Sequence, residues 1–482
     1  SRRSRRRSQT QRLAANCAIG FFIHIHLLTG KGSKAGAITN ALAYMIAKDD
    51  MPLSLTEKPG FKYFIGIVAP FYKVPGRTSV TATLDSKYEI LSAIVKTKLK
   101  RIDHFTLTAD VWTETMTTTS YFGCTVHFVD EDKLSAVVLD VSELSERHTA
   151  EYLQKTFQSI CTDWNIPLDK VTAVVTDNGS NIVKAANDTF GLNKHLACFA
   201  HSLNLVLTRV AGTSESLNDS VLLKLPQSPP MLSASEVAIV RELLEILRPA
   251  ENVSKELCAQ AYVTSSKVIP TISCLRKAIE EIETSSKIGQ TFKTDLIKEL
   301  DRRFKSVELN YLISIATLLD PRFKRLHFPT AISCAKTIDK INFLLKQDQT
   351  NVSMVEHHAT TNVTTRDNVW KFHTELVNKK KDYETDALGS GGLDGDLKQY
   401  LSKGTISLEA DPIKYWNDQK ENVPRLASIA LKYLSIVATS VPCERLFSMA
   451  GNVVSPSRNR LNGERIARLV FLKSLEFTDW HL

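Results

Sequence analysis

The spacing of apolar residues changes along the chain, and each change predicts a different kind of structure. Between residues 38 and 101 apolar residues recur every three or four positions, which predicts helices. In the segment ITNALAYMIAKD one face collects the side chains of Ile38, Leu42, Met45 and Ile46. The segment PFYKVPGRTSV interrupts this period with two prolines, so we expect a loop there before the helical pattern resumes.

From residue 104 the apolar period becomes two, which is typical of β-strands. Three such runs follow one another: HFTLTADVWT, YFGCTVHFVD and LSAVVLDVSE. A helical pattern then separates them from a fourth run, DKVTAVVTDN, whose continuous apolar character is typical of a strand buried on both faces. A further helical pattern, GSNIVKAANDTF, comes next. This order predicts an α/β fold, in which a mixed sheet is covered by helices.

Helical periodicity dominates again from about residue 199 to 340. Residues 345–400 are polar and end in DALGSGGLDGD, which predicts a flexible linker. Helical patterns return in VPRLASIALKYLSIVAT and RIARLVFLKSLEF. The second pattern has an apolar band that either packs inside the chain or contacts a second copy: Ile466, Leu469, Val470 and Leu472.

Composition and charge narrow the class of protein. A chain of 482 residues is too long for one core, so we expect two or three folding units. Its eight cysteines form no CxxC pair, which argues against a disulfide framework or a cysteine-rich zinc module. The net charge is +9, and six of these charges come from arginines among the first twelve residues. This basic arm suits phosphate contact or nuclear import, or is a solvated tail. No segment reaches membrane-spanning length, so we expect no membrane partner.

Candidate chemistry lies at the ends of two predicted strands. Asp110 belongs to the first strand run and Asp177 ends the fourth, so in neighbouring strands their carboxylates would meet at one edge of the sheet. Close carboxylates repel each other unless a cation such as Mg²⁺ or Mn²⁺ joins them. The alternative is a turn or a helix cap, because Asp177 precedes Asn-Gly-Ser. Cys198 and His201 are either half a zinc site or a packed cysteine beside a hydrogen-bonded histidine.

The segment TSVPCERLFSMAGNVVSPSRNRL, at residues 439–461, places a carboxylate at the start of an apolar helical pattern. Locally this is a helix start: Ser440 can cap the helix, Pro442 suits its first turn, and Glu444 faces its positive end. A role for Glu444 in a metal site becomes an expectation only through a family resemblance.

That resemblance rests on an ordered series of motifs: LTADVWT, VTAVVTDNGSNIVKA, CFAHSLNLV, LLDPRFK, DPIKYW and ATSVPCERLFSMAGNVVSPSRNRL. In this order they resemble the hAT superfamily of transposases, most closely its domesticated zinc finger BED domain-containing relatives. The resemblance implies an RNase H-like mixed sheet interrupted by an all-helical insertion. It also implies a helical N-terminal region, a C-terminal hAT dimerisation region and action on DNA.

The implied domains are a basic and apolar N-terminal segment, disordered or artefactual, over 1–37 and a helical N-terminal region over 38–101. The first part of the RNase H-like core then covers 102–198, the helical insertion and linker 199–400, and the dimerisation region that completes the core 401–482. The implied catalytic acids and metal ligands are Asp110, Asp177 and Glu444. The family's Cys-x-x-His signature falls on Cys198 and His201. We expect DNA contacts at Arg458 and Arg460. Dimerisation is expected at Leu446, Phe447, Ile466, Leu469, Val470 and Phe471.

Two departures from the family pattern shape the functional expectation. Before Ile38 the chain offers only Cys17, His24 and His26, which cannot complete a four-ligand zinc site, so zinc is not expected. The Arg-Trp-Asn-Ser-type motif early in the insertion is also missing. We therefore expect a domesticated nuclear protein that forms a homodimer, binds DNA or chromatin and regulates transcription. The alternatives are an active transposase or nuclease that uses Mg²⁺ or Mn²⁺, and a scaffold that has lost DNA contact.

Overall fold

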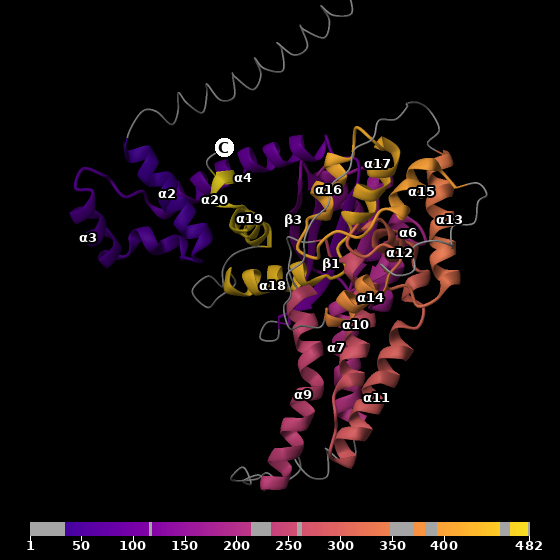
Figure 1. The fold of residues 1–482 in the computed structure, drawn as a ribbon. Helices are drawn as coiled ribbons and strands as arrows, with labels where there is room; N and C mark the ends of the chain where they lie inside the picture. Colours follow the sequence, from indigo (N-terminus) through magenta and orange to yellow (C-terminus); the bar gives the residue numbers. More distant parts are fainter. Residues whose placement is uncertain are drawn as a thin grey trace, which may run out of the picture. The chain divides into compact units, whose positions relative to one another are not determined.

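The computed structural model describes residues 34–114, 118–213, 233–257, 263–347, 370–380, 393–453 and 463–480. The chain divides into two compact units, one over residues 96–448 and one that joins residues 1–95 to 449–482 (Figure 1). Cys17, His24 and His26 lie outside the described residues. Among the helices that are described, none combines the length and the apolar character needed to cross a membrane.

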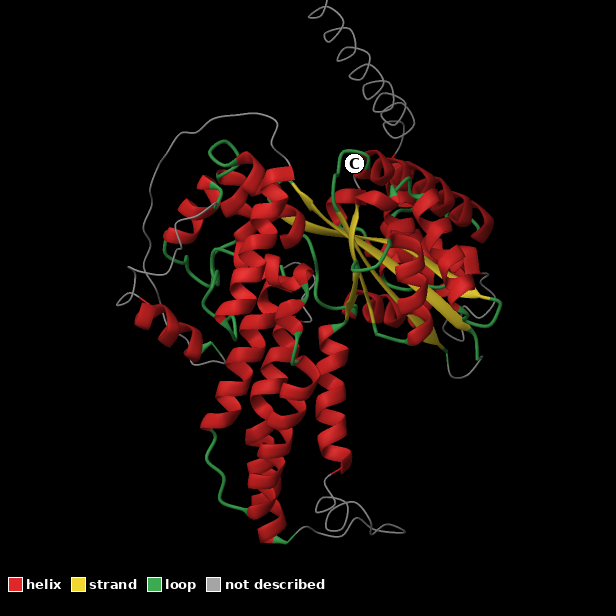
Figure 2. Ribbon diagram, turned by 90° about the vertical axis from the view of Figure 1, so that its right-hand side faces the viewer, coloured by secondary structure: helices red, strands yellow, loops and turns green. Residues whose placement is uncertain are grey.

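The larger unit is built on one mixed sheet with the strand order β3-β2-β1-β4-β5. Strands β1, β2 and β3 pair antiparallel, whereas β4 lies parallel to β1 and β5 parallel to β4. Figure 2 shows the strands in yellow among the covering helices. The mixed α/β fold expected from the apolar periods is therefore confirmed. The strand bounds are β1 Phe105–Thr113, β2 Ser120–Asp130, β3 Lys133–Leu144, β4 Val171–Thr176 and β5 His195–Ala197.

Two helices that follow the strands along the chain cover the sheet, α5 (Ala150–Asp163) and α6 (Ser180–Phe190). Thr149 caps α5, since its side chain accepts a hydrogen bond from the backbone N–H of Tyr152. Phe157 of α5 is fully buried, and its ring makes edge contacts with rings from β2 and from α6. All six residues of β4 are buried, as its continuous apolar pattern predicted.

The predicted helical insertion is a bundle that extends away from the sheet (Figure 2). Helices α7, α9, α10 and α11 contact one another in this bundle, and α12 joins α13 and α17 beside it. The bounds are α7 Phe199–Thr213, α9 Ala234–Leu257, α10 Val268–Glu281, α11 Lys287–Phe304, α12 Tyr311–Leu319, α13 Ala331–Gln347, α16 Pro412–Asp418 and α17 Pro424–Leu434. Short 3₁₀ helices lie at Leu168–Lys170 (η2), Ser265–Lys267 (η3) and Val307–Leu309 (η4).

The linker predicted over residues 345–400 contains structure that its polar composition did not indicate. Helix α14 (Lys371–Lys380) lies inside it, and α15 (Gly395–Ser402) begins before its end. Trp370 explains the difference, because its indole ring stacks on Phe323 at 5.7 Å and its N–H donates to Glu256 at 2.9 Å. His373, one turn further along, is buried. A few anchoring side chains thus fix a helix within an otherwise polar stretch.

The motif LLDPRFK forms a buried polar network beside α12. Asp320 is fully buried and pairs with the guanidinium of Arg322 through two hydrogen bonds, of 2.9 and 2.6 Å. Ser266 donates a third hydrogen bond to Asp320, at 2.6 Å. Lys324, also buried, donates to the carbonyl oxygen of Tyr400 at 2.7 Å. The charged residues of this motif therefore hold α12, η3 and α15 together.

The smaller unit joins the N-terminal helices to the end of the chain. Helix α19 contacts α2, and Phe471 of α19 makes an edge contact with Tyr88 of α4 at 5.3 Å. Arg468 pairs with Asp85 at 3.2 Å. The helices are α2 Lys34–Lys48, η1 Leu53–Glu57, α3 Pro59–Val68, α4 Arg77–Leu99, α18 Val441–Val453, α19 Gly463–Ser474 and α20 Phe477–Trp480; the unit boundaries fall inside α4 and α18.

The C-terminal region is divided between the two units, with residues 401–448 in the larger and 449–482 in the smaller. The side chains expected at a dimer interface are buried within this single chain: Leu446, Phe447, Ile466, Leu469, Val470 and Phe471. The domain bounds and the dimer contacts stay predictions, and the band at 466–472 is packed within the chain in this structure.

Candidate active site

Asp110 and Asp177 lie at the same edge of the sheet because of the register between their strands. In the parallel pair β1–β4, Thr108 lies opposite Val175, and each aspartate follows two residues later. Asp110 is only 9% exposed, and one of its carboxylate oxygens accepts a hydrogen bond from the Val111 N–H at 2.8 Å. This pairing places both aspartates at one edge of the sheet.

Asp177 and Glu444 both act electrostatically on Asp110. The pKa of Asp110 is raised to about 7, first by burial, then by the negative charge of Asp177 and, more weakly, by that of Glu444. The hydrogen bond from Val111 acts in the opposite direction. Residues separated by more than 300 positions are therefore close enough to affect the same carboxyl group, as the idea of a shared site requires.

Helix α18 brings Glu444 to this edge by packing on the first two strands. The Cys443 thiol donates to the hydroxyl of Thr108 in β1 at 3.4 Å. Phe447 stacks on Trp112 at the end of β1, with ring centroids 5.9 Å apart. Glu444 lies in the first turn of α18 and is exposed, so it can face both the helix N-terminus and the acids.

The expected cap by Ser440 is not formed. Its backbone carbonyl oxygen accepts from the N–H groups of Cys443 and Glu444, whereas its buried hydroxyl has no hydrogen-bond partner. The N–H of Ser440 points instead to the sulfur of Cys198, at 3.3 Å. The helix start is thus correct in position, but Ser440 serves to link α18 to the beginning of α7.

Cys198 is a packed cysteine in this structure. It is 1% exposed, accepts hydrogen bonds from the N–H groups of Ser440 and His201, and has a pKa raised by burial. The cysteine is therefore arranged as in the second alternative for the Cys-x-x-His signature, that of a packed cysteine. Its sulfur orients two backbone segments that converge near the acids.

Asp177 also has the turn-forming role that its Asn-Gly-Ser neighbours indicated. Its Oδ1 accepts from the N–H of Gly179 at 3.0 Å, and Asn178 between them has a positive φ of 78°. The turn directs the chain from β4 into α6. Because only one oxygen is used, this role leaves the carboxylate able to act in a site as well.

His195 is a neighbour of the acids that the sequence did not reveal. It lies in β5, and its Nε2 is 2.9 Å from the hydroxyl of Thr176, the residue before Asp177. Burial lowers its pKa, and the charge of Asp177 acts in the opposite direction. A three-residue strand is too short to show an apolar period, so nothing in the pattern marked this position.

Three carboxylates offer the hard oxygen donors that Mg²⁺ and Mn²⁺ take. The ligand type of these three residues is therefore suited to a divalent cation. Within the described parts of the chain, however, no three His, Cys, Asp or Glu side chains are grouped closely enough to hold a metal ion. The acids share a region of the surface without forming a finished coordination site.

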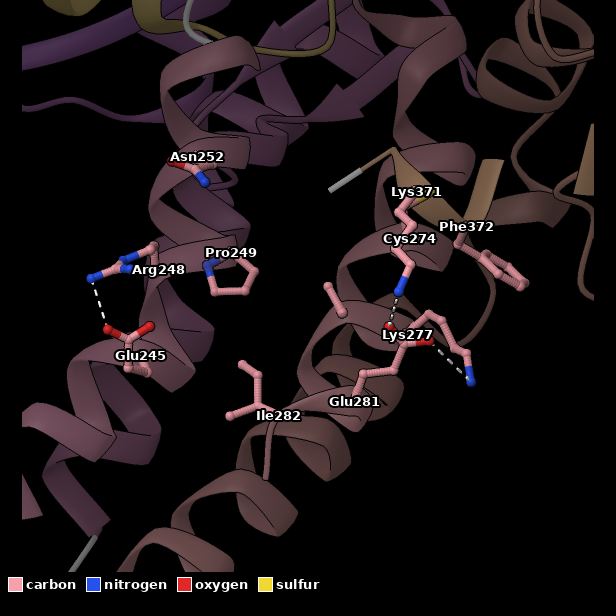
Figure 3. A pocket seen from close by; sticks show the side chains of 11 residues that line it. Glu245, Arg248, Pro249, Asn252, Cys274, Lys277, Glu281, Ile282, Lys371 and Phe372 are labelled. Carbon is pink, nitrogen blue, oxygen red and sulfur yellow. Dashed lines mark ion pairs between the residues drawn. The ribbon is translucent and has the colours of Figure 1, made fainter. Parts of the chain in front are cut away.

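A separate cavity of about 270 Å³ lies in the insertion, between helices α9, α10 and α14 (Figure 3). Its charged side chains form ion pairs, Glu245 with Arg248 and Glu281 with both Lys277 and Lys371. None of the three acids lines it. Arg458 and Arg460, the expected DNA contacts, lie outside the described residues.

Two family models match the chain, and both match regions described above. The ZBED1 RNase-like domain matches residues 108–200, which contain Asp110 and Asp177. The hAT family C-terminal dimerisation region matches residues 396–475, which contain Glu444. The mixed sheet is therefore RNase-like, as expected, and the C-terminal helices form the expected hAT region.

Individual relatives agree with these matches. Zinc finger BED domain-containing protein 4 of Homo sapiens is 23% identical over 91% of this chain and 43% of its own length. Putative AC transposase of Zea mays is 24% identical over 90% of the chain and 64% of its own length. Transposable element Hobo transposase of Drosophila melanogaster is 22% identical over 61% of the chain and 46% of its own length.

The chain thus spans less than two thirds of the length of these relatives. The matches still cover both the strands that carry the aspartates and the helix that carries the glutamate. The chain thus carries a ZBED1 RNase-like domain and a hAT C-terminal dimerisation region, and it is similar along most of its length to hAT transposases and to zinc finger BED domain-containing proteins.

Proposed function

We propose that this protein is a domesticated, transposase-derived nuclear dimer that binds DNA or chromatin and regulates transcription without turnover. The observation that carries the proposal is the presence, in one chain, of an RNase-like domain and a hAT dimerisation region. The RNase-like domain supplies a scaffold related to proteins named as transposases. The dimerisation region supplies the contact between two copies of the chain. Curated relatives along most of the chain include zinc finger BED domain-containing proteins 4 and 6.

Charge supports the DNA contact in this proposal. The chain carries a net charge of +9, and six arginines stand among its first twelve residues. Cations that neutralise phosphates release counterions, so such binding weakens steeply as salt increases. A basic arm at one end of the sequence is suited to this kind of sequence-independent attachment.

A duplex-binding titration tests the proposal. We expect the full chain to bind a fluorescent DNA duplex with an affinity that falls linearly, on logarithmic axes, with salt concentration. A variant with all six arm arginines changed to serine should show a shallower slope, by roughly 0.9 for each phosphate that the arm no longer neutralises. The same substitutions should leave the dimer intact. If the wild-type chain does not bind DNA even at low salt, the result favours the scaffold alternative.

A second candidate function has its own supporting observation. The coupling of Asp110 to Asp177 and Glu444 favours a metal-dependent DNA transposase or nuclease. In this reading the three carboxylates would hold Mg²⁺ or Mn²⁺, which when bound would activate a water or hydroxyl for attack on a phosphodiester. Asp110 must give up its proton to bind the cation, and Asp177 would hold its carboxylate in place through the turn at Gly179.

Metal-dependent nicking of a supercoiled plasmid distinguishes this enzyme from the turnover-free regulator. The enzyme requires nicking that Asp177→Asn abolishes and that Asp188→Asn, a change at an exposed acid of α6, leaves unchanged. Metal binding also has a readout independent of activity. Because Asp110 titrates near pH 7, Mg²⁺ or Mn²⁺ should raise the melting temperature more at pH 8 than at pH 6. A wild-type chain that neither nicks nor responds to either metal excludes this candidate.

A further inference from the structure

Helix α3 is strongly apolar, yet none of its residues is buried. Four large side chains of the helix are more than half exposed, and one just after it is fully exposed. They are Tyr63 (74%), Phe64 (59%), Ile67 (67%), Val68 (64%) and Phe71 (103%). Soluble proteins rarely leave such a group of neighbouring apolar side chains in water, so this surface calls for a partner.

Four of the exposed side chains form one stripe along the helix. Positions 63, 64, 67 and 68 share one face of α3, and Phe71 follows beyond the end of the helix, after the non-helical residue Ala69. The chain that follows the helix is linked to α2, because the hydroxyl of Tyr72 lies 2.8 Å from that of Thr39. We name the five exposed side chains together the α3 stripe.

We propose that the α3 stripe is a homodimer surface, covered by the same stripe of a second copy of this chain. The first argument is area. An exposed aromatic side chain offers roughly 150–250 Å², and the stripe contains three aromatic and two aliphatic side chains. Their sum approaches the ~800 Å² that each partner contributes to a standard stable interface.

The second argument concerns where dimerisation is encoded. This inference rests on the dimeric state in the proposed function. The end of the matched dimerisation region, residues 449–475, belongs to the same compact unit as α3. Within that unit the apolar residues of α19 are buried and cannot contact a partner while the unit is folded. The α3 stripe is apolar surface that the same unit still exposes, and a dimer of this unit can use it directly.

The third argument is geometric. In a twofold dimer one patch meets its own copy, and a single helix face can pack on itself in this way. Gly60 lies on the same face of α3 as the stripe and brings no side chain, and a Cβ atom there would meet nothing within 4 Å. Two copies of the helix can therefore approach closely at this position.

The charges around the stripe predict how salt affects the contact. Lys58, Lys62 and Lys73 are exposed next to it, and a second copy would bring the same cations nearby. Because added salt screens repulsion between like charges, self-association through the α3 stripe should hold or tighten as salt increases. Binding of the same surface to DNA, or to an acidic protein segment, should instead weaken with salt.

Sedimentation velocity of the full chain in low and high salt tests the inference. We expect the wild type to be a dimer in both, and Ile67→Glu to dissociate at least tenfold more readily. Ile332→Glu is the matched control, since Ile332 is 70% exposed but lies in α13 of the other unit, and it should remain dimeric. Phe71→Ser, at a fully exposed position, should weaken the dimer without lowering the melting temperature of the monomer.

Three results would overturn the inference, and they differ in what they imply for the proposed dimer. If Ile67→Glu and Phe71→Ser remain as dimeric as the wild type, the contact lies elsewhere and the proposed dimer survives. If the wild type is monomeric at every concentration tested, both the inference and the dimeric state fail. A loss of duplex binding in Phe71→Ser with an unchanged dimer would assign the stripe to DNA, and it too would contradict the inference.

Discussion

Gly123 of β2 lies directly under Leu446 of α18: a Cβ atom at position 123 would come within 2.6 Å of the Leu446 Cδ2 atom. It would also come within 2.8 Å of the ring of Phe447. Gly123 is the antiparallel partner of Asp110 in the β1–β2 pair. The missing side chain thus sets how closely the helix that carries Glu444 approaches the strand that carries Asp110.

Replacing Gly123 tests this relationship. Gly123→Ala should lower the free energy of unfolding by about 1–3 kcal/mol, because an added methyl group in a filled core forces α18 away from the sheet. Chemical denaturation measures the change. Gly212→Ala, in α7, is the control, since a Cβ atom there meets nothing and the helix should gain up to ~1 kcal/mol. Equal effects of the two substitutions would show that the close contact has no energetic weight.

The raised pKa of Asp110 predicts a stability that depends on pH. Folded Asp110 keeps its proton up to about pH 7, whereas the unfolded chain releases it near 3.8. Between these values the unfolded state binds fewer protons, so this residue lowers stability as pH rises from about 4 to 7. At ~1.4 kcal/mol for each pKa unit, the loss at pH 8 is on the order of 2–4 kcal/mol.

The neutral variant should remove this loss. Asp110→Asn is expected to raise the melting temperature at pH 8 by several degrees and to change it little at pH 4, as measured by calorimetry. The exposed Asp188 supplies the control, and Asp188→Asn should show no such difference between the two pH values. An Asp110→Asn variant that is no more stable at pH 8 than the wild type argues that the carboxyl group is not in a desolvated, repulsive environment.

The parts of the fold that were predictable from sequence are those with a strong period. Four strands and the helices that cover them were expected because each is long enough for an apolar period to repeat. Asp110 and Asp177 could be placed at one edge because their strands are neighbours in a parallel pair. Glu444 had no such signal, and only the resemblance to a family connected it to two strands so far away in the chain.

The remaining features depend on contacts that a local pattern does not contain. β5 has three residues, fewer than a period needs. Helix α14 is fixed by Trp370 and by a buried histidine in a polar stretch. The apolar band of α19 has the same pattern whether it faces its own chain or another, and its contacts with α2 and α4 could not be read from that pattern. Tertiary partners, rather than propensity, determined these outcomes.

Changing one partner of the buried pair Asp320–Arg322 should strongly destabilise the protein. Replacing both residues together should be tolerated. Arg322→Met leaves the carboxylate of Asp320, fully buried, without its ionic partner, and should cost about 3–5 kcal/mol of unfolding free energy. The exposed pair Glu245–Arg248 is the matched comparison, and Arg248→Met should cost less than ~1 kcal/mol.

A double variant completes this test. Asp320→Leu combined with Arg322→Met should recover much of the loss, because it removes both charges from the interior. Denaturant titrations of the four proteins give the coupling energy between the two residues. If the two single losses simply add in the double variant, the residues are not acting as a pair, and the LLDPRFK network must be held mainly by Ser266 and by Lys324 with Tyr400.

Substitution of Phe471 tests whether the end of the dimerisation region belongs to a core or to an interface. It is 1% exposed and packs edge-on against Tyr88 within the smaller unit. As a core residue, Phe471→Ala should cost about 3–5 kcal/mol in the unfolding of that unit at any protein concentration. If Phe471 were at an interface, the loss would instead shrink as dilution converts the dimer to monomer. Calorimetry at several concentrations separates these cases, with Phe71→Ala as the control at a fully exposed position of the same unit. Phe71→Ala should leave the dilute monomer as stable as the wild type, so a large loss there would mean that α3 supports its own unit rather than a partner.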